Sequence, residues 1–109
     1  MEQTFNKLVR DNIPDIIKKN DEVAVTRVLN SEEYRKELYK KLLEETNEVI
    51  NAKTKNEVLE ELADIYEVVR SISELENSDI DSIKNIAEQK KIKRGGFTKR
   101  IFLVKTYNK

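Results

Sequence analysis

The chain has 109 residues, of which 39% are charged and 38% hydrophobic, and its 21 basic residues balance its 21 acidic residues. This profile favours one helix-rich soluble domain, residues 1–109, over a disordered or membrane protein. The chain contains neither cysteine nor histidine, which excludes disulfides, thiolate metal sites and the usual histidine bases and zinc ligands. No N-terminal secretion pattern is visible, so we expect a cytoplasmic protein.

Charge is distributed unevenly along the chain. No acid follows Glu88, whereas eight cations do: Lys90, Lys91, Lys93, Arg94, Lys99, Arg100, Lys105 and Lys109. A carboxylate-rich middle and a cationic end point to a ligand with both metal and phosphate character, and the alternative is a solvated basic tail.

The first thirty residues predict little regular structure. Phe5 to Val9 suggest a short strand or turn, and Pro14 suits the first turn of a helix that ends near Asn20. The β-branched stretch "EVAVTRVLN" predicts an extended segment that leads to Ser31.

Two long helices are predicted in the middle of the chain. Ser31 is the expected cap of the first, which should run to about Ala52. The stretch "TKNE" from Thr54 to Glu57 predicts a capping box at the start of the second, which should end near Leu75.

A third helix and a strand complete the prediction. Ser78 or Asp79 is expected to cap this helix, and the two glycines at 95 and 96 should end it. Its apolar face is formed by Ile80, Ile83, Ile86, Ala87 and Ile92. Arg100 to Lys105 predict a short strand that pairs with the N-terminal "FNKLV". The expected fold is therefore a mainly α helical bundle with a short terminal strand pair.

Carboxylates interrupt the apolar stripes of both long helices. At about 100° per residue, Glu45 falls among Leu38, Leu42 and Val49, and Glu48 lies on its flank. Glu61 and Asp64 form a second pair with the same spacing.

Four carboxylates that face one another need a cation among them, because unpaired buried charges cost several kcal/mol each. Neither central stripe supplies a Lys or Arg, and all-oxygen ligands favour Mg²⁺, with Mn²⁺ as a substitute. A solvated, purely structural set of charges is the alternative.

These motifs resemble a known family. "EETNE" at 44–48 followed by "ELAD" at 61–64 resembles the EExxE…ExxD signature of the all-α nucleoside triphosphate pyrophosphatases, the MazG-like superfamily. "KLVRDNIP" and "KRGGF" resemble its phosphoribosyl-ATP pyrophosphohydrolase-like, or house-cleaning, group. The resemblance spans nearly the whole chain.

The resemblance implies hydrolysis of a nucleoside triphosphate between its α and β phosphates. It also implies that Glu45, Glu48, Glu61 and Asp64 are the metal ligands, and that Glu44 supports them or orients the attacking water. Either Glu44 or Glu45 can accept the proton of that water, and the sequence does not separate the two.

Phosphate oxygens need cationic partners. The candidates are Lys91 and Arg94 before the glycine pair, and Lys7 and Arg10 near the start. Ordinary helix capping is the alternative for the first two, and an Arg10–Asp11 ion pair is an equal alternative for Arg10.

Two other classes of function stay open. One is a nucleotide-binding or regulatory module with little turnover, and the other is a helical module whose basic end contacts nucleic acid, which we regard as less favoured. The limited core favours a homodimer or higher homo-oligomer, and no membrane partner is expected.

Overall fold

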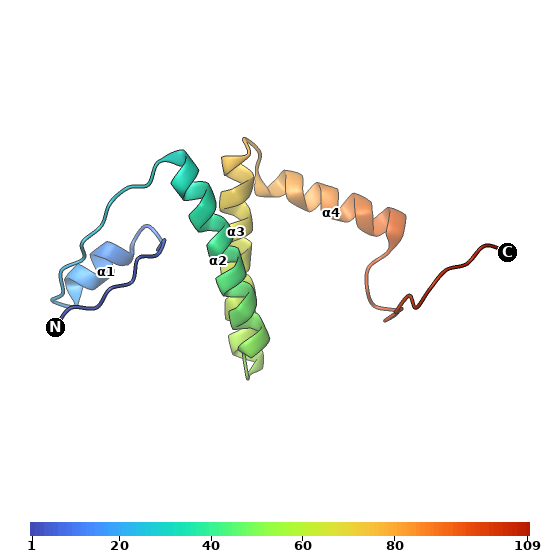
Figure 1. Ribbon diagram of the computed structural model, residues 1–109, viewed down its shortest axis with the longest axis horizontal. Coiled ribbons are helices and arrows are strands. Elements are labelled where there is room, and N and C mark those ends of the chain that lie inside the picture. The colour runs from blue at the N-terminus through green and yellow to red at the C-terminus, as the bar shows by residue number, and fades with distance from the viewer.

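The computed structural model describes all 109 residues and contains four helices and no strand. The helices are α1 (Ile13–Lys19), α2 (Ser31–Asn51), α3 (Lys55–Leu75) and α4 (Ile80–Arg94). Helices α2 and α3 form an antiparallel hairpin at the centre, with α1 on one side of it and α4 on the other (Figure 1). The mainly α prediction and the bounds of both long helices are thus confirmed. None of the helices has the length and apolar character needed to cross a bilayer.

The start of α2 is fixed by Asn30 rather than by the predicted cap. The Asn30 side chain accepts a hydrogen bond from the backbone amide of Glu33 at 2.9 Å, and the Glu33 carboxylate accepts one from the backbone amide of Asn30. Arg27 donates to both oxygens of that carboxylate, and this hydrogen bonding lowers the pKa of Glu33. The prediction of Ser31 as the cap was wrong, because Asn30 is extended and places its own side chain over the first turn.

The other two caps follow the sequence more closely. Thr54 accepts a hydrogen bond from the Glu57 amide at 3.1 Å, but the Glu57 side chain accepts from the Lys53 amide, so only the threonine half of the predicted box forms. Asp79, one of the two predicted candidates, caps α4 by accepting from the Ser82 amide at 2.8 Å.

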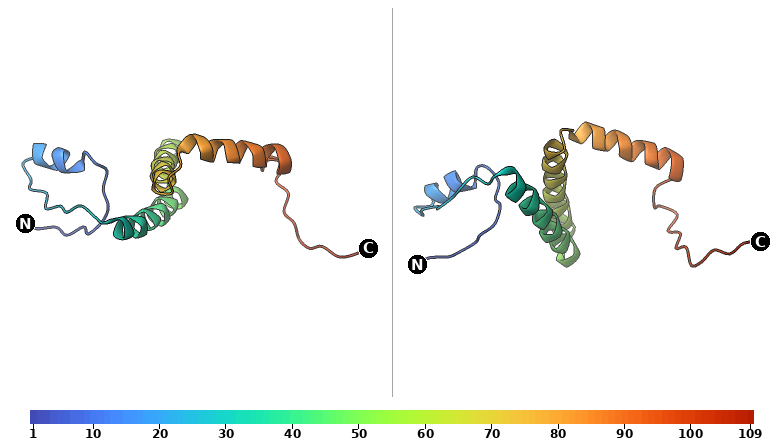
Figure 2. Two further views of the ribbon diagram at one scale, coloured as in Figure 1. Left: turned by 90° about the horizontal axis from the view of Figure 1, so that it is seen from above. Right: turned by 45° about the horizontal axis from the view of Figure 1, so that its top comes forward.

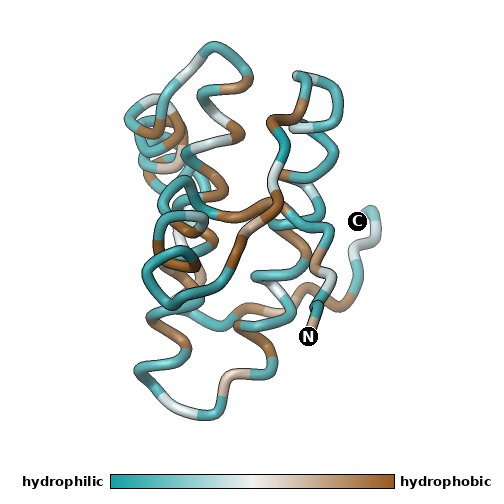
Figure 3. Tube along the Cα trace, turned by 90° about the vertical axis from the view of Figure 1, so that its left-hand side faces the viewer, coloured by the Kyte–Doolittle hydropathy of each residue, from teal (hydrophilic) through white to brown (hydrophobic).

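The hydrophobic core is narrow and lies between α2 and α3. Only four residues are buried, namely Leu38, Glu45, Val68 and Ser73. An ion pair between Arg35 and Glu76 joins the beginning of α2 to the end of α3. The apolar positions are spread along the whole trace rather than gathered in one enclosed centre (Figure 3).

One prediction for the C-terminal third was wrong. Residues 100–105 form no strand, because a strand needs a paired backbone and the two ends of the chain lie on opposite sides of the molecule (Figure 1). The predicted apolar face of α4 is not covered either, since this helix leaves the hairpin after Leu75 (Figure 2). Ile86 is 55% exposed and Ile92 is 78% exposed.

Candidate metal and phosphate site

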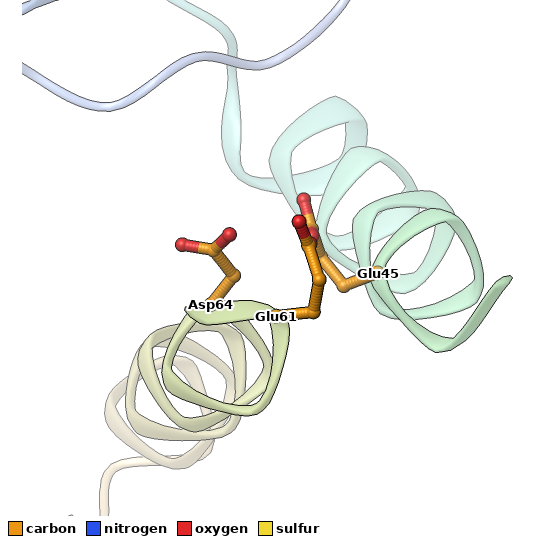
Figure 4. Close-up of side chains that lie close together, drawn as sticks. All are labelled: Glu45, Glu61 and Asp64. Atoms are coloured by element: carbon orange, nitrogen blue, oxygen red, sulfur yellow. The ribbon is translucent and has the colours of Figure 1, made fainter. Parts of the chain in front are cut away.

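Three carboxylates from the two long helices converge on one point. Glu45 projects from α2 toward Glu61 of α3, and Asp64 lies one turn further along α3 (Figure 4). One oxygen of each residue lies within 4.8 Å of the others. We call these three residues the acid cluster. Of the four acids expected to face one another from consecutive helices, these three lie together.

The local sequence explains why the cluster forms inside the hairpin. Glu45 is only 9% exposed, because it occupies the same arc of α2 as the buried Leu38. Glu61 and Asp64 are half-buried on the opposing arc of α3, which also carries Val68. The sequence therefore places carboxylates at positions where an apolar side chain would otherwise complete the core.

Burial changes the acidity of Glu45 strongly. Its loss of solvent, a hydrogen bond with Glu61 and the negative charges of Asp64 and Glu61 together raise the pKa of Glu45 to about 7, against the opposing effect of Lys41. Carboxylates held this close together and shielded from water repel one another, so the cluster favours binding of positive charge.

The structure separates Glu48 from the acid cluster. Glu48 is exposed and does not belong to the group of converging oxygens. It lies three residues after Glu45, which turns it by about 60° around α2 toward solvent. All four carboxylates of the two pairs were predicted to converge on one point. The structure brings together three of them and leaves Glu48 out.

Glu44 lies beside the acid cluster rather than in it. Its carboxylate is half-buried, 3.5 Å from Nζ of Lys41 and 3.8 Å from Nζ of Lys7. The position agrees with the expectation that Glu44 supports the site without being one of the converging ligands. Lys7 therefore lies next to Glu44, and its role in phosphate binding stays a prediction.

Arg10 and Lys41 bring positive charge to the cluster. Arg10 donates a hydrogen bond to Asp64 at 2.7 Å, and the alternative ion pair with Asp11 is not observed. Nζ of Lys41 lies 4.0 Å from Glu45. Sequence reasoning missed Lys41, although its spacing of three and four residues from Glu44 and Glu45 was a usable signal.

The other two predicted phosphate-binding residues are not near the acid cluster. Lys91 and Arg94 are in the last turn of α4. Figures 1 and 2 show that this end of α4 points away from the hairpin, on the side opposite the N-terminal segment. Within one chain, therefore, the cationic end of α4 and the acid cluster remain apart.

A cleft of about 720 Å³ opens over the cluster, between the N-terminal segment and the hairpin. This volume lies within the range of about 300–1,000 Å³ that is common for small-molecule sites. The polar lining includes Arg10, Lys41, Glu45 and Asp64, and the apolar lining includes Leu8, Ile16, Tyr34 and Leu38. The cleft thus combines charged groups at one point with apolar walls around them.

The donor set of the cluster fits a hard divalent cation. All three groups supply oxygen, no sulfur or imidazole is available, and the three converging carboxylates place negative charge at one point. Mg²⁺ keeps several waters or phosphate oxygens among its ligands, so three protein carboxylates suffice.

Comparisons of the chain with protein-family models, with curated proteins and with solved structures found no match.

Proposed function

We propose that the chain is a Mg²⁺-dependent nucleotide pyrophosphohydrolase that cleaves a nucleoside triphosphate between the α and β phosphates. The observation that carries the proposal is the convergence of Glu45, Glu61 and Asp64 inside the hairpin, where Glu45 and Asp64 line an open cleft. The position of the scissile bond comes from the sequence resemblance described above. Mn²⁺ is the expected substitute for Mg²⁺.

Five charged residues of the site have a role in this proposal. Glu45, Glu61 and Asp64 hold the cation, which supplies neutralisation of the polyphosphate and activation of a water molecule. Arg10 and Lys7 contact phosphate oxygens from the N-terminal segment, where they already lie next to Asp64 and Glu44. No covalent nucleophile is required, which agrees with the lack of cysteine and histidine.

Glu44 is the proposed proton acceptor. It directly precedes Glu45, is not among the converging ligands, and pairs with Lys7 and Lys41 while remaining partly exposed. A carboxylate that is free of the cation can take the proton of the attacking water, whereas Glu45 is used as a ligand. The apolar walls at Leu8, Ile16 and Tyr34 provide space for the nucleoside.

The test is release of pyrophosphate from a panel of canonical and modified nucleoside triphosphates, with Mg²⁺ and with EDTA. We expect metal-dependent release that Glu45→Gln abolishes and that Glu48→Gln, a matched change on the exposed side of α2, preserves. Reaction in isotopically labelled water should place the label in the monophosphate. If the folded protein binds Mg²⁺ and triphosphate but releases no pyrophosphate from any of them, the chain is a nucleotide-binding module.

A further inference from the structure

Positive charge is concentrated in the C-terminal arm, which we define as α4 together with residues 95–109. After Glu88 the arm contains eight cations and no acid, although the chain as a whole has no net charge. All residues after Glu88 are exposed, and none of the eight cations forms an ion pair. The end of the arm therefore attracts polyanions, whereas the remainder of the molecule, which is net negative, repels them.

A shallow hollow runs along one face of α4. Its lining residues form two adjacent rows at a spacing of four, with Asn85, Gln89 and Lys93 in one row and Ile86, Lys90 and Arg94 in the other. At about 100° per residue, the two acids of α4, Asp81 and Glu88, lie on the opposite side of the helix. The face thus presents amide and cationic donors without a carboxylate, and such donors contact the phosphate and sugar oxygens of nucleic acids.

Aromatic side chains follow α4 at a regular spacing of five residues. Phe97, Phe102 and Tyr107 are 96%, 88% and 84% exposed. Cations alternate with these rings, at Lys99, Arg100 and Lys105. Residues 101–109 form neither helix nor strand and extend away from the other elements (Figures 1 and 2). Five residues of extended chain span about 17 Å, so each ring has room to stack on a different base.

This combination favours single-stranded nucleic acid over other polyanions. Aromatic rings stack on unpaired bases, whose flat faces are hidden inside a duplex. A membrane surface instead selects a helix with separate apolar and charged faces. Helix α4 lacks that separation, because Lys90 lies between Ile83 and Ile86 around the helix axis.

We propose that the C-terminal arm binds single-stranded nucleic acid, with α4 along the phosphate backbone and Phe97, Phe102 and Tyr107 stacked on bases. RNA and DNA share the chemistry that this surface recognises. From the sequence, nucleic-acid contact was less favoured as the function of the whole chain, and here it is a second activity of the arm alone. It does not depend on the proposed hydrolysis, because the acid cluster and the cleft take no part in it.

Binding is measured by fluorescence anisotropy with labelled oligouridine and oligothymidine of about 20 nucleotides. The strands end in a 5′-hydroxyl and the buffer contains EDTA, so that neither a triphosphate nor a metal ion recruits them to the cleft. At about 0.15 M salt we expect a Kd of about 10 μM or lower, with a slope of about −4 for log K against log salt if six phosphates are contacted. Glu45→Gln should bind as the wild type does. Absence of saturable binding at this salt concentration would overturn the proposal.

The phosphate contacts are tested by neutralising three cations of the arm. Replacing all three with Gln, at Lys99, Arg100 and Lys105, should make the salt slope shallower by about 2. These positions follow α4, so circular dichroism should show an unchanged helix content. The matched control replaces three exposed lysines outside the arm with Gln, at Lys18, Lys19 and Lys53. An equal loss of slope in the control would overturn the assignment to the arm.

The stacking is tested by Phe97→Leu with Phe102→Leu, which keeps two apolar side chains and removes both rings. Affinity for the single strand should fall about 30-fold at an unchanged salt slope, because each lost stack costs about fivefold or more. Affinity for a duplex of the same length should change little. Unchanged single-strand binding in this variant, or tighter wild-type binding to the duplex, would overturn the proposal. Tighter binding to phosphatidylserine vesicles than to the oligonucleotide would instead assign the arm to a membrane surface.

These outcomes are separate from those of the hydrolysis assay. A protein that releases no pyrophosphate but binds the oligonucleotides as described loses the proposed function and keeps this inference. A protein that releases pyrophosphate and ignores the oligonucleotides does the reverse.

Discussion

Arg10 donates a hydrogen bond to Asp64 at 2.7 Å, and the two residues are 54 positions apart in the sequence. This contact joins the N-terminal segment to α3 at the edge of the acid cluster. Both side chains remain partly exposed, so the pair adds little to stability. Its importance is electrostatic, because it sets a fixed positive charge beside the carboxylates that are proposed to hold Mg²⁺.

Removal of that charge should separate metal binding from nucleotide binding. In Arg10→Met, we expect Mg²⁺ to bind a few-fold more tightly by calorimetry, because one repulsive charge is gone. The KM for the triphosphate should rise about tenfold, since a charge-assisted contact to phosphate is lost. Arg10→Lys keeps the charge and serves as the control, with an intermediate KM. An unchanged KM in Arg10→Met would exclude Arg10 from phosphate binding.

The proton acceptor is distinguished from the ligands by two neighbouring variants. Glu44→Gln should lower kcat by about 10²-fold or more and leave the Mg²⁺ affinity nearly unchanged, because Glu44 is not one of the converging ligands. Glu45→Gln should weaken Mg²⁺ binding itself, because Glu45 belongs to the acid cluster. Steady-state kinetics and calorimetry on both variants measure this difference. Full activity of Glu44→Gln would transfer the role of base to another group.

The raised pKa of Glu45 predicts that the metal-free protein is less stable at high pH. The value rises from the ordinary 4.5 to about 7, so the folded state binds this proton more tightly than the unfolded state. The corresponding stabilisation is complete below about pH 4.5 and is lost as the pH rises through about 7, with a total of about 2–3 kcal/mol.

Urea unfolding between pH 5 and 8 checks this expectation, because the acids with lowered pKa, such as Glu33 and Asp79, are ionised throughout that range. The free energy of unfolding should fall with pH in the wild type and stay nearly level in Glu45→Gln. Added Mg²⁺ should restore the stability of the wild type most strongly above pH 7. A level profile in the metal-free wild type would contradict the raised pKa of Glu45.

The cap of α2 offers a test of the fold alone. Asn30→Ala should cost about 1 kcal/mol of stability, because the Glu33 amide loses its partner. Ser31→Ala, a change at the position that the sequence indicated, should stay within about 0.5 kcal/mol. Thermal unfolding of both variants measures the difference. A larger loss for Ser31→Ala would restore Ser31 as the cap.

The periodicity of the sequence determined the two long helices and the inward position of Glu45. Apolar residues at helical spacing specify which arc of a helix is buried, and the neighbours along the same helix suffice to place Glu45 on that arc. The sequence also predicted that Glu45 and Glu61 face each other, because a short connection makes consecutive helices lie antiparallel. The same reasoning failed for Glu48. This residue lies at the edge of the buried arc, and only the packing angle of the two helices decides whether it faces α3 or solvent.

Only the tertiary structure decided which cations reach the acids and where the chain ends lie. Arg10 meets Asp64 across 54 residues, and no local pattern encodes such a contact. The strand expected at 100–105 is absent for a similar reason, because β-propensity becomes a strand only when a partner backbone is within reach. Periodicity is a property of neighbouring residues, whereas the completion of this site depends on segments that are distant in sequence.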